Sequence, residues 1–285
     1  MHVKAGEQAG DEVTQLPFRL GTTSFIYPAT WSVNVERLAG RVDDVELLIF
    51  EATRDRDLPD EAELAELAAL QQRTGLSFTV HTPLGLGLAS EDKAWQRESV
   101  ERIWRVVEVT RMLSPHGWLV HVNGGQGEGS PVPADEEGWR RRARWSLLEL
   151  VARGVPPERI CIESLNYDFA RIEPVIAELG LSVAVDVGHL LRDGRSIDGV
   201  LSGNLARTRV IHWHGVDSDG RDHRSLRLWP RCLAKALLRS LIDADYRGVL
   251  TLEVFGENDF EESLQMVGEL LAELDIRHKP LTNQP

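Results

Sequence analysis

The chain has 285 residues, of which 42% are hydrophobic and 27% charged, a composition typical of folded globular proteins that excludes wholesale disorder. Its 45 acidic and 32 basic residues give a formal net charge of -13, so most of the surface repels phosphate backbones and general nucleic-acid binding is not expected. Two cysteines are too few for a disulfide framework, and no apolar run approaches the roughly 18 residues that a membrane-spanning helix needs. We expect a cytoplasmic protein without a membrane partner.

Short runs rich in Val, Ile and Leu recur along the chain, and each is followed by a polar turn and a longer stretch with helical spacing. The predicted strands are Phe18–Ser24, Asp44–Glu51, Leu76–Thr82, Gly117–Asn123, Arg159–Glu163, Leu181–Val187, Thr208–Gly215 and Gly248–Val254. The clearest predicted helices are Asp60–Thr74, Asp92–Leu113, Glu136–Arg153, Trp229–Asp243 and Phe260–Leu274.

Strand runs that are apolar on both faces, such as SVAVDV and VLTLEV, favour a parallel sheet covered by helices. Eight such units without a break in composition predict an α/β protein with a single (β/α)8 barrel over residues 17–277. An open doubly wound sheet is the alternative. Residues 1–16 and 278–285 have little hydrophobic periodicity and are predicted to be tails outside the barrel.

The active site of such a barrel lies at the C-terminal ends of its strands. Histidines and carboxylates gather at the predicted strand ends and in the loop after the seventh strand: His81, His121, Glu163, Asp186, His189, His212, His214, His223 and Glu253. One such residue alone is more often a hydrogen-bonded structural group or a helix cap. Several carboxylates close together at this end of the barrel, where the dielectric constant is low, however oppose one another's ionisation unless a cation lies among them.

Mixed histidine and carboxylate ligation is typical of zinc, manganese and iron(II), so the sequence predicts a divalent-metal site. Four of the residues, namely Glu163, Asp186, His212 and Glu253, suffice for one ion. The surplus histidines indicate two or three ions.

These residues resemble the xylose isomerase-like barrel superfamily, which includes endonuclease IV and many sugar isomerases and epimerases. Within it, the stretches RLGTTSFIYP, DDVELLIFE, HTPL, DVGHL, IHWHGV and DHRSL look like the cobamide-remodelling phosphodiesterases, the CbiR family. The most specific part of the resemblance is IHWHG followed by DHRSL. This resemblance implies hydrolysis of the nucleotide-loop phosphodiester of cobamides, the corrinoids of the vitamin B12 group, to a cobinamide-type product.

The resemblance also implies roles for individual residues. Glu163, Asp186, His212 and Glu253 would hold a principal ion, and His81 and His121 a second one bridged by Glu163. The endonuclease branch adds histidines on strands three, four and six, here His81, His121 and His189, and an Asp-x-His pair. This chain departs from that pair, because Asp222 directly precedes His223.

The remaining expectations complete the predicted site. His189 and His223 would hold a third ion or contact phosphate, and zinc or manganese is the expected metal. Glu51, at the predicted end of strand two, would orient a water or a ligand and so join Glu163 and Glu253 as a catalytic residue. The predicted substrate contacts are His214, Arg221 and Asp222.

Two other functions fit the same pattern. A sugar isomerase or epimerase would hold one ion on the four principal ligands, and Glu163 and Glu253 would pass a proton across a sugar carbon. His81 and His121 would then contact sugar hydroxyls. A non-catalytic protein that binds a corrinoid or a sugar phosphate is the third hypothesis, because a fold does not fix function.

Overall fold

Eight parallel strands form a closed barrel in the computed structural model, which describes residues 16–54, 57–127 and 129–276. The strands are β1 (Arg19–Thr23), β2 (Asp44–Leu48), β3 (Ser77–His81), β4 (Trp118–Val120), β5 (Ile160–Glu163), β6 (Ser182–Asp186), β7 (Thr208–Trp213) and β8 (Val249–Leu252). Each strand pairs with the next one along the chain, and β1 pairs with β8. The predicted (β/α)8 barrel is therefore confirmed, and the open sheet is excluded.

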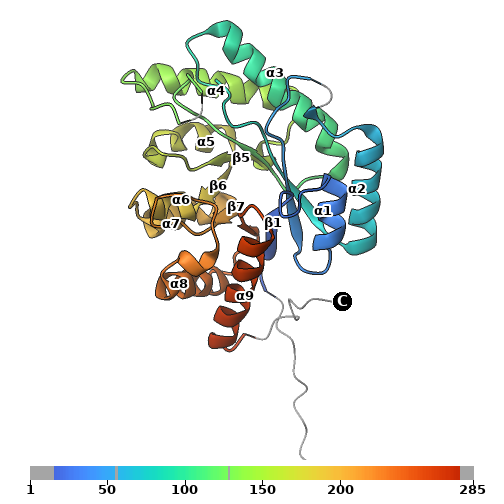
Figure 1. Cartoon of the computed structure of the whole chain (residues 1–285). Coiled ribbons are helices and arrows are strands. Elements are labelled where there is room, and N and C mark those ends of the chain that lie inside the picture. The colour runs from blue at the N-terminus through green and yellow to red at the C-terminus, as the bar shows by residue number, and fades with distance from the viewer. Residues whose placement is uncertain (1–15, 55–56, 128, 277–285) are drawn as a thin grey trace, which may run out of the picture.

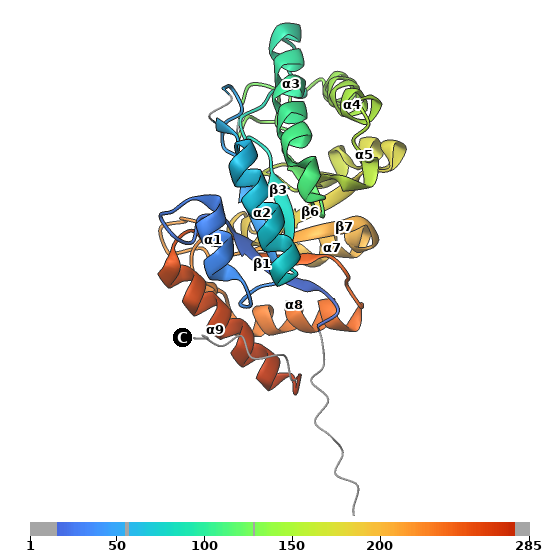
Figure 2. The same cartoon turned by 90° about the vertical axis from the view of Figure 1, so that its right-hand side faces the viewer.

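Helices surround the strands on the outside (Figures 1 and 2). They are α1 (Trp31–Leu38), α2 (Glu61–Thr74), α3 (Lys93–Thr110), α4 (Glu136–Ala152), α5 (Glu173–Leu179), α6 (Val187–Arg192), α7 (Ile197–Asn204), α8 (Arg231–Asp243) and α9 (Glu257–Glu273). Short 3-10 turns lie at Arg111–Leu113, Pro157–Arg159, Phe169–Arg171, Leu205–Arg207 and Leu226–Leu228. The five predicted helices are confirmed with shifted ends, whereas α1, α5, α6 and α7 are too short to give a clear period.

The residues at the two ends of α2 show how the local sequence sets where a helix begins and ends and where the next strand starts. Asp60 caps α2, because its side chain accepts the backbone N–H of Glu63 at 2.9 Å. Gly75 ends α2 in the left-handed conformation, with φ of 77°, which glycine adopts without a steric penalty. The chain then reverses within two residues and enters β3, whose last residue is His81.

Two kinds of packing hold the barrel together. The main hydrophobic core lies between the strands and the helices, as shown by the burial of residues such as Val183 and Val185 of β6. A small separate cluster of Leu119, Cys161, Ala184 and Val210 comes from four successive strands. Buried Asp44 on β2 accepts hydrogen bonds from Ser77 and Thr79. Burial raises the pKa of Asp44 to about 6.

The predicted tails fall almost entirely outside the described residues. Leu16 is the exception, since it is 6% exposed and its side chain packs in the hydrophobic core. Within the described ranges, no helix is long and apolar enough to cross a bilayer.

Candidate metal centre

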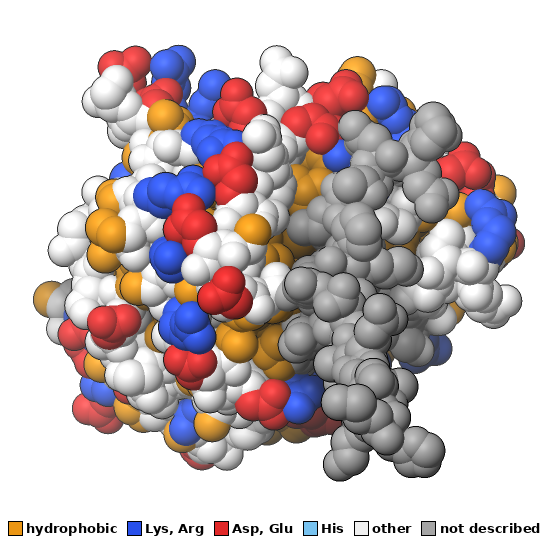
Figure 3. All heavy atoms as spheres, turned by 90° about the horizontal axis from the view of Figure 1, so that it is seen from below, with side chains coloured by type: hydrophobic (Ala, Val, Ile, Leu, Met, Phe, Trp, Pro, Cys, Tyr) orange, Lys and Arg blue, Asp and Glu red, His pale blue; other side chains and the backbone are white. Residues whose placement is uncertain are grey.

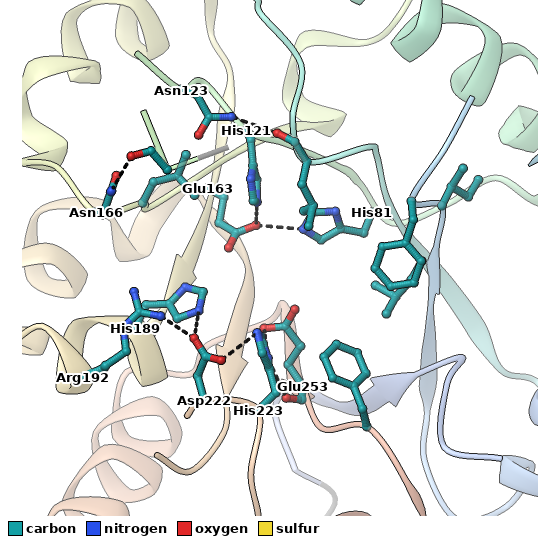
Figure 4. A pocket seen from close by; sticks show the side chains of 17 residues that line it. His81, His121, Asn123, Glu163, Asn166, His189, Arg192, Asp222, His223 and Glu253 are labelled. Carbon is teal, nitrogen blue, oxygen red and sulfur yellow. Dashed lines mark hydrogen bonds and ion pairs between the residues drawn. The ribbon is translucent and has the colours of Figure 1, made fainter. Parts of the chain in front are cut away.

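A cavity of about 380 Å³ opens at the C-terminal ends of the strands and is lined by residues that follow them. Seven predicted site residues line it: His81, His121, Glu163, His189, Asp222, His223 and Glu253. Figure 4 shows their side chains pointing toward one another from two sides of this cavity. Asp186 and His212 lie fully buried beneath them.

Glu163, the last residue of β5, binds the two histidines from β3 and β4. Its Oε2 lies 3.1 Å from Nε2 of His81 and 2.9 Å from Nε2 of His121. The opposite nitrogen of His81, Nδ1, donates to the backbone carbonyl of Thr82 at 2.8 Å. Because a carbonyl only accepts, Nδ1 of His81 stays protonated, so Nε2 is the nitrogen that would bind a metal ion once its own proton is lost.

Asp186 ends β6 and also caps α6, where its Oδ1 accepts the backbone N–H of His189 at 2.7 Å. Its Oδ2 lies 2.8 Å from Nδ1 of His189, and its Oδ1 lies 3.2 Å from Nε2 of His214. The backbone N–H of His223 donates to Nδ1 of His214 at 3.0 Å. Nδ1 of His214 also lies 3.2 Å from the backbone carbonyl of Gly215, so contacts on both ring nitrogens fix this ring beside Asp186.

His212 on β7 lies between carboxylates on both sides of its ring. Its Nε2 donates to Oε2 of Glu46 at 3.0 Å, and its Nδ1 lies 3.1 Å from Oε2 of Glu253 and 3.8 Å from Oε1 of Glu163. Glu46 on β2 and His212 are both fully buried. The Glu46 carboxylate therefore fixes the ring so that Nδ1 faces the other two carboxylates.

The loop after β7 brings two consecutive side chains to the same cavity. His223 adopts the left-handed conformation, with φ of 54°, which histidine tolerates more readily than most residues. Its Nδ1 donates to the backbone carbonyl of Glu253 at 3.2 Å. Asp222 lies 3.2 Å from Nε2 of His189 and also binds Arg192. Asp222 and His223 therefore both reach the site, although no residue separates them as one does in an Asp-x-His pair.

The buried charges shift one another's protonation strongly. Burial alone would raise the pKa of Glu163, but the charge of His121 and the hydrogen bonds from its histidine neighbours hold that pKa well below the usual range. The pKa of Asp186 is also lowered, because the charges and hydrogen bonds of His214 and His189 outweigh the opposite effect of burial. Burial lowers the pKa of His81, yet the hydrogen bond and charge of Glu163 raise it to about 9.

The donor set fits a divalent ion. Oε1 of Glu46, Nδ1 of His212 and Oε2 of Glu253 are buried without a hydrogen-bond partner, although the last two atoms lie 3.1 Å apart. Buried polar atoms without a partner are rare in native proteins and point to a missing ion or water. An ion between imidazole nitrogen and carboxylate oxygens would satisfy them.

Several groups of three side chains place ligand atoms within 4.8 Å of one another. They are His81 with His121 and Glu163; Glu163 with Asp186 and His212; Glu46 with His81 and Glu253; Asp186 with His214 and Glu253; and His189 with His214 and His223. Because Glu163 belongs to the first two groups, the cluster could hold more than one ion.

Three predicted site residues require correction. Glu51 is exposed, because β2 ends at Leu48, and its carboxylate accepts the hydroxyl of Thr53. The side chain of Arg221 is 72% exposed and pairs with acidic neighbours in its own loop, Asp217 and Asp219, away from the cavity wall.

The third correction concerns His214. It does not line the cavity, because it is fully buried and its ring bonds Asp186; it belongs instead to two of the candidate ligand groups.

Sequence reasoning missed Glu46, a buried carboxylate inside β2 that binds His212, and three polar residues of the cavity wall, Asn123, Asn166 and Arg192. The available signal for Glu46 was the alternation in Asp44–Leu48, which places Asp44 and Glu46 on the same face of β2.

The chain belongs to the xylose isomerase-like TIM barrel family, whose sequence profile matches residues 38–273. No curated protein matches it in sequence.

Solved structures of the same fold include a D-tagatose 3-epimerase-like protein, with a TM-score of 0.71 and 16% identity over 90% of this chain and 98% of that one. A 3-keto-D-glucoside 4-epimerase from E. coli has a TM-score of 0.67 and 17% identity over 90% and 99%. Endonuclease IV from Thermus thermophilus has a TM-score of 0.67 and 18% identity, also over 90% and 99%.

Replacing Glu46 by glutamine is expected to weaken metal binding by about 10-fold to 100-fold, because the amide holds the His212 ring less firmly than a carboxylate. Titration of the metal-free protein with zinc against a competing chelator measures the change. Asp44→Asn is the matched control, since Asp44 is a buried carboxyl on the same strand whose hydrogen-bond partners are Ser77 and Thr79. Equal affinities in all three proteins would show that Glu46 does not support the site.

Proposed function

We propose that this protein is a divalent-metal-dependent phosphodiesterase that hydrolyses the nucleotide-loop phosphodiester of cobamides. The observation that carries the proposal is the position of Glu163 between two ligand groups, one with His81 and His121 and one with Asp186 and His212. A shared carboxylate between neighbouring cation sites is the arrangement expected for two-metal phosphoester hydrolysis. A single-metal site would leave His81 and His121 without ligand roles.

Zinc or manganese, in two or three copies, is the cofactor we propose. Glu163, Asp186, His212 and Glu253 would hold the principal ion, His81 and His121 the second with Glu163, and His189 and His223 a third. Such ions supply positive charge for the phosphate oxygens and lower the pKa of water toward about 7.

Arg192 supports a phosphate-bearing substrate, because it is the sole lysine or arginine among the described residues that line the cavity. It extends from the end of α6, and its guanidinium is held by Asp193 at 2.8 Å and by Asp222. Arginine presents several N–H donors in a fixed plane, which suits phosphate oxygens. We infer that Arg192 contacts the phosphodiester beside the ions.

The proposed reaction requires water and the diester alone. The hydroxyl of water joins phosphorus as one phosphorus–oxygen ester bond breaks, and the remaining proton passes to the departing alkoxide. Glu253 lines the cavity and would orient the attacking water. The products are a phosphomonoester and an alcohol.

The choice of a cobamide rests on the sequence resemblance to the CbiR family. The net charge of -13 agrees with a small-molecule substrate and with no nucleic-acid partner. Among the described residues visible in Figure 3, acidic and basic side chains are interspersed.

The test is incubation of zinc-loaded and manganese-loaded protein with a cobamide, followed by chromatography of the corrinoids and metal analysis. We expect a cobinamide-type product and two or three ions per chain, with turnover lost on chelation and restored by the ion. An unchanged cobamide together with epimerisation of a ketose and one ion per chain would instead establish the sugar epimerase. Tight corrinoid binding without turnover of either compound would establish a binding protein.

A further inference from the structure

We propose that Phe50 and Phe255 form a subsite for a planar aromatic group of the substrate, next to the metal centre. In a cobamide this group would be the base of the nucleotide loop, so the inference rests on the proposed function and specifies how that substrate is held. Both phenylalanines line the cavity described above.

The first argument is exposure. Phe25, Phe50 and Phe255 are 41%, 48% and 38% exposed. They follow β1, β2 and β8, which are neighbours in the barrel because β1 pairs with both of the other strands. Single exposed apolar residues are ordinary, but a group of aromatic rings at the mouth of a cavity marks a binding surface.

The second argument is the packing of the rings. Phe25 supports Phe50 in an edge-on contact, with centroids 5.0 Å apart and planes at 69°. The ring of Phe255 packs on that of His223, with centroids 4.9 Å apart. Phe255 therefore touches a candidate ligand, so an aromatic group a few bonds from a metal-bound phosphate is within reach of it.

The third argument is the polarity of the cavity. Leu48, Ile49 and Phe50, which end or follow β2, line it together with Phe255 after β8. Asn123, Asn166 and Arg192, which follow β4, β5 and β6, also line it. The two aromatic side chains therefore come from a different sector of the closed barrel than these amide and guanidinium groups, while Leu84 and Leu165 add apolar lining after β3 and β5. A ligand with an anionic end and a flat apolar end is thus held in one orientation.

The experiment compares the binding of 2-naphthyl phosphate and methyl phosphate to the zinc-loaded protein by calorimetry. The two monoesters carry the same anionic group and differ in the aromatic ring. We expect the naphthyl ester to bind about tenfold more tightly, a difference within the range that an added aromatic contact contributes. Phe50→Ala and Phe255→Ala should each reduce this preference to less than about threefold.

Two controls make the result specific. Methyl phosphate affinity reports whether a variant has disturbed the metal centre, which matters for Phe255 because it touches His223. Phe50 has no ring contact to a histidine among those found in the described residues, so Phe50→Ala tests the subsite independently. Leu233→Ala removes a side chain of similar exposure, 47%, on α8 and should keep the full preference.

Equal affinity for the two esters in the unaltered protein, or an unchanged preference in both phenylalanine variants, would overturn the subsite. These measurements need no turnover. If the preference depends on Phe50 and Phe255 but cobamides stay intact, the subsite stands and the proposed function fails.

Discussion

Replacing Glu163 by alanine is expected to abolish metal retention and hydrolysis together. The carboxylate contacts both His81 and His121, lies 3.8 Å from His212, and is 2% exposed. Its loss removes the carboxylate that the His81 and His121 group shares with the Asp186 and His212 group. We expect turnover to fall by more than about 100-fold, because removal of a single group that stabilises charge in the transition state already costs about 100-fold to 1000-fold.

Metal content per chain, measured by elemental analysis, and the rate of cobamide hydrolysis are the two readouts. Glu51→Ala is the matched control, because it also deletes a carboxylate but from the exposed segment beyond β2. It should leave both quantities unchanged. If Glu163→Ala keeps its ions and turns over at the rate of the unaltered protein after exhaustive chelation and reloading, the metal mechanism is wrong.

The metal-free protein is expected to be most stable near pH 4.5 to 6.5, roughly between the ordinary pKa values of carboxyl groups and histidine. Burial raises the pKa of Glu253, but the charges of His212 and His223 lower it to about 2. A carboxyl group with a lowered pKa stabilises the fold above its ordinary value. This contribution is lost as the pH falls through the folded value of about 2.

The histidines have the opposite effect, because they make the folded protein less stable as the pH rises. Burial lowers the pKa of His189, but Asp186 and Asp222 raise it to about 11, and the pKa of His81 is about 9. A histidine with a raised pKa stabilises the fold fully below about pH 6.5, its ordinary pKa. The stabilisation disappears as the pH rises through the folded values, because the buried carboxylates lose their cationic partners.

Melting temperatures of chelated and zinc-loaded protein from pH 3 to 10 test this. The chelated protein should melt at progressively lower temperature above about pH 6.5, whereas bound ions replace the lost protons and keep the loaded protein stable. The gap between the two forms should therefore widen toward pH 9. A melting temperature that rises from pH 6 to 9 in the chelated protein would contradict the charge arrangement described here.

The sequence predicted the barrel well because each β/α unit carries its own pattern. All eight strands lie within their predicted segments, and the long helices α2, α3, α4, α8 and α9 showed a clear apolar face. Helices of six to eight residues, such as α6, complete too few turns to give a period. Strand ends were predicted too long where apolar residues continue into the rim, as at Ile49 and Phe50.

The candidate site was less predictable than the fold. Strand-end position was enough to bring together His81, His121 and Glu163, because parallel strands all end at the same rim. It failed for Glu51, since the true end of β2 decides which acidic residue faces inward. Strand-end position does not account for His223 either, which was predicted from the loop after β7; it lies next to the bridge between Gly215 and Arg224 and lines the cavity.

The strands carry candidate ligands and the loops carry the aromatic residues, and this separation has an evolutionary consequence. Candidate ligands such as Glu163, Asp186 and His212 are anchored in strands that have hydrogen-bonded neighbours on both sides. Phe25, Phe50 and Phe255 belong to the connections that follow. Insertions or exchanges in those connections would alter what fits over the candidate metal site and leave its ligand arrangement intact. New substrate preferences can therefore arise on this scaffold while the proposed metal ligands are inherited unchanged.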